Sequence, residues 1–266
     1  MAHAQLRPLA FGEILDGAFA LYRRHFSTFF LGSLLPLLPA LAVGLLAALV
    51  VTAAGSAAAA LAAVGLLLLL LAPLLLGCQV LQWSVLTDMV SQAYTGHAVS
   101  VGVGVSRGLV HFLPLLGATI IAAVLVLVGL VFLVVPGLLL ACMFFAVAPA
   151  VVVERRGPIT ALSRSRELAS GAWGRIFLLV TVAYIIAALP SWGLQGISRL
   201  STGVSAGELI LQDPVMYGVV QLISLLISAL TLPFVVGAIV LLYYDRRVRA
   251  EALDVELATE GLAAAG

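Results

Sequence analysis

The most constraining feature of this sequence is the length of its charge-free runs. No Asp, Glu, Lys, Arg or His occurs in residues 26–87, and none occurs in residues 112–153. About 20 apolar helical residues cross a bilayer core of roughly 30 Å, so each run is long enough to cross twice. Backbone amides in lipid must be hydrogen-bonded within their own segment, which predicts helices.

The remaining apolar runs complete a pattern of six crossings. We predict an all-α fold, a polytopic transmembrane helical bundle of six spans with interfacial amphipathic helices. The predicted spans cover approximately residues 27–52, 57–78, 113–135, 137–153, 176–198 and 217–244 of one integral membrane domain, 1–266, with a cytoplasmic tail at 245–266. Only 9% of the residues are charged, against about 25% in a soluble domain.

Two details refine these spans. Pro136-Gly137 is a strong turn signal and predicts a tight hairpin between the third and fourth spans. The second apolar run continues to about Gln92, so its helix is expected to tilt, to kink at Pro73 or to project into the cytoplasm.

Arginine placement predicts the orientation. All 13 basic residues are Arg, a bias typical of a GC-rich bacterial genome. With an N-terminus inside, every arginine except Arg199 falls on the cytoplasmic side, as the positive-inside rule requires. We therefore expect a multi-pass protein of the bacterial plasma (inner) membrane with both termini cytoplasmic.

Three charged but periodic segments precede the odd-numbered spans. In the first, Ile14 and Ala18 share an apolar face opposite Asp16 and Arg23. In the third, Pro158 suits a first helical turn, and the apolar face is expected to run from Ala161 to Trp173. The middle segment, residues 100–111, is weaker and rich in glycine. The segments are either three copies of one unit or helices that simply mark the lipid–water interface.

The sequence offers little chemistry. The predicted spans themselves contain no acid. Asp88 lies in the helix that continues beyond the second span, and we expect it to be solvated at the cytoplasmic end rather than to carry protons. Gly102, Gly104 and Gly108 lack dinucleotide-binding spacing and are interpreted as loop or helix-packing positions. We predict no catalytic residue, no cofactor and no metal site. A net charge of +1 also argues against a nucleic-acid partner.

An ordered set of short motifs carries a family resemblance. They are Phe11-Gly12-Glu13-Ile14-Leu15-Asp16, Tyr94-Thr95-Gly96, Pro136-Gly137, Pro149, Glu154 with Gly157, Ala161-x-x-Arg164-Ser165-x-x-Leu168-x-x-Gly171 and Tyr244-Asp245-x-Arg247-x-Arg249-x-Glu251. In these motifs the chain resembles the bacterial glycerophosphoryl diester phosphodiesterase membrane domain family. The resemblance implies a membrane module without the catalytic barrel, because about 250 residues would be needed for such a barrel.

The preferred function is a non-catalytic membrane scaffold or accessory module that engages lipid headgroups or a membrane protein partner. The residues expected to contact headgroups are Arg155, Arg156, Arg164, Arg166 and Arg175, with Arg246, Arg247 and Arg249 on the same side. The simpler alternative is that these arginines only set the topology. The rival function is a transporter of a lipid or small solute, with a polar path lined by Gln79, Gln82, Gln195 and Gln221. An enzyme is the least favoured class.

Overall fold

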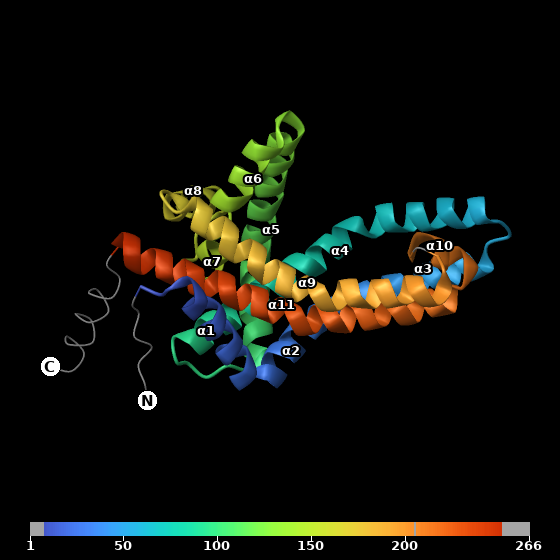
Figure 1. Ribbon diagram of the computed structural model, residues 1–266, viewed down its shortest axis with the longest axis horizontal. Coiled ribbons are helices and arrows are strands. Elements are labelled where there is room, and N and C mark those ends of the chain that lie inside the picture. Colours follow the sequence, from blue (N-terminus) through green and yellow to red (C-terminus); the bar gives the residue numbers. More distant parts are fainter. Residues whose placement is uncertain (1–7, 205, 252–266) are drawn as a thin grey trace.

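The computed structural model describes residues 8–204 and 206–251, and within these ranges the chain is helical without any strand. The predicted all-α fold is therefore confirmed. The expected cytoplasmic tail begins inside the last helix, and its residues 252–266 lie outside the described residues. Figure 1 shows long helices that radiate from a central region.

The helices follow one another with short connections. They are α1 (Phe11–Arg24), α2 (Phe26–Leu34), the 3-10 turn η1 (Leu35–Leu37), α3 (Leu38–Ala53), α4 (Ala57–Tyr94), α5 (Val101–Phe132), α6 (Val134–Met143), α7 (Val147–Val152), α8 (Pro158–Ala169), α9 (Trp173–Thr202), α10 (Ala206–Gln212) and α11 (Pro214–Glu251). Six stretches are long and apolar enough to cross a membrane: Phe26–Ala53, Ala57–Tyr94, Val101–Phe132, Val134–Val152, Trp173–Thr202 and Pro214–Glu251. The chain is a multi-pass integral membrane protein.

The spans form three hairpins that meet around α11. The α3–α4 hairpin and the α9–α11 hairpin extend side by side toward the right of Figure 1, and α3 contacts α11 along this length. The α5–α6 hairpin instead points toward the top of Figure 1. Of the six stretches, α11 has the most buried apolar window, whereas the most apolar window of α4 is hardly buried at all. α11 is therefore the central helix of the fold.

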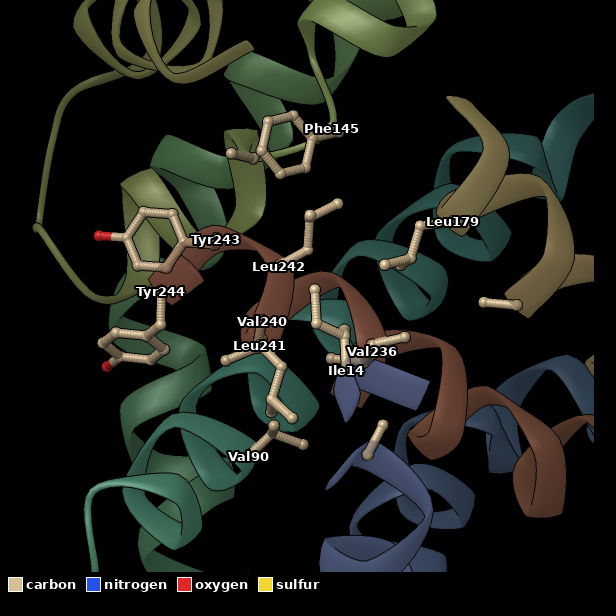
Figure 2. Packing of buried hydrophobic residues seen from close by; sticks show 14 of the residues in the cluster. Ile14, Val90, Phe145, Leu179, Val236, Val240, Leu241, Leu242, Tyr243 and Tyr244 are labelled. Carbon is tan, nitrogen blue, oxygen red and sulfur yellow. The ribbon is translucent and has the colours of Figure 1, made fainter. Parts of the chain in front are cut away.

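The hydrophobic core lies where the bases of the hairpins meet. It combines Ile14 of α1, Val90 of α4, Phe145 between α6 and α7, and Leu179 of α9 with the second half of α11. Figure 2 shows these side chains converging on Val240, Leu241 and Leu242. Ile14 and Leu179 have no exposed surface. The amphipathic face predicted for the first segment is thus turned inward, against α11.

The third amphipathic segment is shorter than expected. α8 begins at Pro158, as predicted, and buries Ala161, Leu162, Ser165, Leu168 and Ala169. It ends at Ala169, because Gly171 adopts a left-handed conformation with φ +71° and reverses the chain. The prediction that the same face continues to Trp173 is wrong, since Trp173 begins α9.

The glycine-rich middle segment is not a separate interfacial helix but the first part of α5. Its glycines allow close contact with α4: a Cβ at Gly104 would lie 2.5 Å from Met89 Cγ, and one at Gly108 would lie 2.5 Å from Val85 Cγ2. The Ser84 hydroxyl of α4 donates to the Gly108 carbonyl at 3.0 Å. The interpretation of Gly104 and Gly108 as packing positions is confirmed.

The predicted tight hairpin between the third and fourth spans is present, but its turn lies earlier than expected. The chain becomes extended at Leu133, with φ −163° and ψ 141°, and Pro136 sits in the first turn of α6. Proline is tolerated there because first-turn N–H groups lack partners within the helix. A Cβ at Gly137 would lie 2.7 Å from the backbone nitrogen of Leu130, so this glycine sets the spacing of the two helices.

Replacing Gly137 with Ala should therefore destabilise the α5–α6 hairpin by about 1–3 kcal/mol, the usual cost of overpacking a close contact. Thermal unfolding of the purified protein in detergent would show this as a lowered midpoint. Gly65→Ala is the matched control, because no atom lies within 4 Å of a Cβ at that position. Equal midpoints for the two variants would contradict the proposed packing role.

Candidate functional site

Glu154 is the centre of a charged network at the base of the bundle. It lies in the turn between α7 and α8, and only 10% of its side chain is exposed. Its carboxylate accepts hydrogen bonds from the Tyr243 hydroxyl at 2.7 Å, from Arg164 Nε at 3.0 Å and from Arg156 Nε at 2.5 Å. Both of its oxygens are therefore satisfied by groups from three separate parts of the chain.

The end of α11 completes this network. Arg247 Nε lies 3.6 Å from Glu154 and 3.1 Å from Glu251, and its guanidinium also packs over the Tyr243 ring at 5.7 Å. Arg164 forms an ion pair with Glu251 as well as with Glu154. We call Glu154, Arg164, Tyr243, Arg247 and Glu251 the Glu154 network; it links the α7–α8 turn and α8 to α11.

The charges in this network stabilise each other's ionised forms. Burial alone would raise the pKa of Glu154, but the hydrogen bonds from Tyr243, Arg156 and Arg164 lower that pKa below its ordinary value. Burial would lower the pKa of Arg164, yet its bonds to Glu154 and Glu251 raise that pKa overall. Glu154 is held as a carboxylate and Arg164 as a cation.

A second buried carboxylate, Asp245, fastens the N-terminal segment to α9 and α11. Its side chain has no exposed surface and lies 2.9 Å from Arg249 Nε and 3.2 Å from Arg175. The Leu9 N–H donates to Asp245 at 2.8 Å, and the Leu9 carbonyl accepts from Arg175 at 2.6 Å and from Arg249 at 2.9 Å. We call Leu9, Arg175, Asp245 and Arg249 the Asp245 clamp.

Arg246 secures the neighbouring helix end. Its Nε donates to the Leu168 carbonyl at 2.7 Å, and another guanidinium nitrogen donates to the Ser170 carbonyl at 2.9 Å. Carbonyls at the end of a helix lack partners within it, and an arginine there also suits the negative end of the helix dipole. Arg246 therefore caps α8.

The five arginines expected to contact headgroups fall into two groups. Arg164 and Arg175 are largely enclosed within the Glu154 network and the Asp245 clamp, and Arg156 is paired with Glu154. Arg155 and Arg166 are exposed and form no ion pair or hydrogen bond with other described residues. Arg155 also adopts φ 54°, an uncommon conformation for a residue with a Cβ. The three tail arginines bind acceptors inside the protein.

Asp88 lies on α4, near its end, where α5 packs against it. Only 8% of this residue is exposed, it is hydrogen-bonded to Gln92, and Arg107 lies 4.0 Å away. The expectation that Asp88 is solvated is therefore wrong. The start of α5 packs against the end of α4 and covers it, which the position of Asp88 in the sequence did not indicate.

The four glutamines expected along a polar path are dispersed. Gln82 is fully buried and donates to the Ser33 carbonyl at 3.0 Å. Gln79 lines a cavity of about 500 Å³ between α4, α5, α6 and α9, whereas Gln221 lines a separate cavity of about 290 Å³ between α3 and α11. Gln195 is exposed on α9 and belongs to neither cavity. The structure does not bring them into a single path.

The charged groups of this site hold helices together through ion pairs and hydrogen bonds. Among residues 8–204 and 206–251, no group of three His, Cys, Asp or Glu side chains is placed to hold a metal ion. The carboxylates of the Glu154 network and the Asp245 clamp are both occupied by guanidinium groups. Of the five arginines expected to contact headgroups, Arg155 and Arg166 are exposed and form no ion pair or hydrogen bond within the described residues.

The family comparison covers most of these elements. Residues 89–246 match the family described as a domain of unknown function, DUF7847, and the chain belongs to this family. No curated protein and no solved structure matches the chain. The matched region begins in α4 and includes Glu154, α8, Arg175 and Asp245.

Replacing Glu154 with Gln should destabilise the fold, because Arg164 and Arg247 lose the carboxylate between them. A fully buried ion pair costs roughly 3–5 kcal/mol when one partner is removed, and partial solvation should reduce this to about 2 kcal/mol. Thermal or denaturant unfolding in detergent measures the difference. Glu167→Gln is the control, since Glu167 is exposed and lies 3.6 Å from Arg164; equal losses from both variants would contradict the central role of Glu154.

The lowered pKa of Glu154 also predicts a dependence on pH. A carboxyl group whose pKa is depressed by folding stabilises the fold above its ordinary pKa. That contribution is lost as the pH falls through the depressed value. The unfolding midpoint of the native protein should therefore fall in acid by more than that of Glu154→Gln; parallel pH profiles would show that Glu154 is not coupled to folding.

Proposed function

We propose that the chain is a non-catalytic membrane module that binds anionic lipid headgroups at the cytoplasmic face of a bacterial plasma membrane. The observation that supports this is the division among its arginines. Arg156, Arg164 and Arg175 neutralise carboxylates of the protein itself, whereas Arg155 and Arg166 are left exposed without such partners.

The position of these two residues suits a lipid phosphate. Arg155 precedes α8 and Arg166 lies in its last turn. α8 connects the candidate span Val134–Val152 to the candidate span Trp173–Thr202, so its two ends lie where the chain leaves and re-enters the membrane. An arginine near an anionic surface contributes about 1 kcal/mol to attraction, and a guanidinium can bind phosphate with two parallel hydrogen bonds.

Arg155→Ala/Arg166→Ala should reduce the retention of anionic lipids without unfolding the protein. Native mass spectrometry of protein extracted with its own lipids would measure the loss. Arg199→Ala is the control, because Arg199 lies at the opposite end of α9 from α8. Unchanged lipid retention in the double variant would reject the proposal and leave topology as the role of these arginines.

The orientation is a separate part of the proposal. The Glu154 network, the Asp245 clamp and α8 gather their arginines at one end of the bundle, and Arg199 stands apart near the other end of α9. Under the positive-inside rule the arginine-rich end is cytoplasmic. Residue 207 should therefore lie outside the cytoplasm. A reporter enzyme that is active only outside the cytoplasm should be active when it is inserted after residue 207, and an inactive fusion, together with activity of a cytoplasmic reporter at the same position, would overturn the orientation.

The motifs that resemble the glycerophosphoryl diester phosphodiesterase membrane domain lend themselves to a structural explanation. Glu154, Arg164, Arg247 and Glu251 of those motifs all belong to the Glu154 network, and Asp245 and Arg249 belong to the Asp245 clamp. We propose that these motifs maintain the fold of the membrane module. This accounts for them without any catalytic role.

A transporter of a lipid or small solute is the alternative function. The cavity between α4, α5, α6 and α9 favours it, because a transported molecule needs a site between spans. The dispersal of the four glutamines argues against a polar solute. Lipid movement between leaflets in vesicles that contain the purified protein would distinguish this function from a static lipid-binding module.

A further inference from the structure

The cavity between α4, α5, α6 and α9 lies in the fork between the α5–α6 hairpin and the rest of the bundle. Its volume is about 500 Å³, within the range of roughly 300–1,000 Å³ that small-molecule sites occupy. Its walls are mainly apolar, with Leu76 and Trp83 of α4, Leu115 and Ala122 of α5, and Phe177 and Tyr184 of α9. Three polar side chains, Gln79, Thr119 and Thr181, also line it, but apolar side chains form most of its wall.

The cavity opens toward the surface that the spans turn to the membrane. Leu76, Phe177 and Tyr184 line it and are 41%, 44% and 44% exposed. All three belong to candidate membrane spans. The molecules that can reach this opening from the side are the surrounding lipids.

The length of the cavity fits within one leaflet. Its walls run from Leu76 to Trp83 in α4 and from Leu115 to Ala122 in α5, which is about 10 Å along a helix. One leaflet contributes about half of the roughly 30 Å hydrocarbon core. In α9 the walls lie near the end that follows α8, so the cavity belongs to the leaflet on the arginine-rich side.

We propose that this cavity is a binding site for one acyl chain of a phospholipid from that leaflet. The proposal rests on the lipid-binding function proposed above and adds where the apolar part of the lipid is held. The acyl chain of the lipid enters past Phe177 and Tyr184 and lies against Trp83. Its headgroup then remains at the membrane boundary, where Arg155 and Arg166 are exposed.

Trp83 is a built-in reporter for this site. The chain has three tryptophans, Trp83, Trp173 and Trp192, so Trp173→Phe/Trp192→Phe leaves Trp83 as the only one. This variant would be reconstituted into phosphatidylcholine vesicles whose acyl chains carry bromine, which quenches tryptophan fluorescence on contact. Strong quenching of Trp83 is expected, although this side chain is half-buried between helices.

Matched substitutions show whether the quencher acts from within the cavity. In the Trp83-only protein, Ala122→Phe fills the cavity from α5 and should remove most of the quenching. Ala123→Phe is the control: Ala123 is the adjacent, exposed residue and does not line the cavity, so quenching should persist. Thr181→Phe, from the opposite wall, gives a second filling variant if Ala122→Phe does not fold.

The outcomes separate this site from the headgroup proposal. Equal quenching in Ala122→Phe and Ala123→Phe would overturn the acyl-chain site, and so would an unquenched Trp83, which would indicate that a second copy or another protein fills the cavity. Repeating the measurement with brominated phosphatidylglycerol tests the headgroups. Quenching that depends on Ala122 but is the same in both lipids would retain the acyl-chain site and reject the anionic-headgroup function.

Discussion

Charges that are buried must be paired, and in this protein two buried carboxylates organise the pairing. Glu154 draws Arg164 of α8 and Tyr243 of α11 to the turn after α7, and Asp245 holds Leu9, Arg175 and Arg249 together. An unpaired carboxylate in either place would carry a large desolvation cost. The two interactions therefore fix how α8, α9 and the N-terminal segment meet the end of α11.

The hairpins are held together at the end where these ion pairs lie, and from there they diverge. The second half of α11 is enclosed by α1, α4 and α9, while the α5–α6 hairpin leaves the bundle in its own direction (Figures 1 and 2). Glycines at Gly104 and Gly108 anchor the start of α5 to α4 before the two separate. The fork that results contains the apolar cavity, so the charged base and the proposed acyl-chain site are parts of the same architecture.

Much of the fold follows from local features of the sequence. Charge-free runs predict the number of long apolar helices, Pro158 predicts the start of α8, and the periodicity around Ile14 predicts the buried face of α1. The hairpin turn was displaced to Leu133, because a Pro-Gly pair also fits a first helical turn when glycine is needed for close packing.

The site was less predictable because its partners are distant in sequence. Tyr243 and Glu154 are separated by 89 positions, and Leu9 and Asp245 by 236. An arginine near a membrane boundary looks the same in sequence whether it binds a phosphate or a carboxylate of its own chain, so Arg164 and Arg175 could not be told from Arg155 and Arg166. The burial of Asp88 could not be predicted for the same reason, because the start of α5, which covers it, is close to it in space and not in sequence.

Glu154 and Arg164 act as a pair that ties α8 to the bundle. A double-mutant cycle measures this most directly: the free energy of unfolding in detergent for the native protein, Glu154→Gln, Arg164→Gln and the variant with both changes. The double variant should lose much less stability than the sum of the single losses, a coupling of about 0.5–3 kcal/mol. Losses that simply add would contradict it, because the two side chains would then stabilise the fold independently.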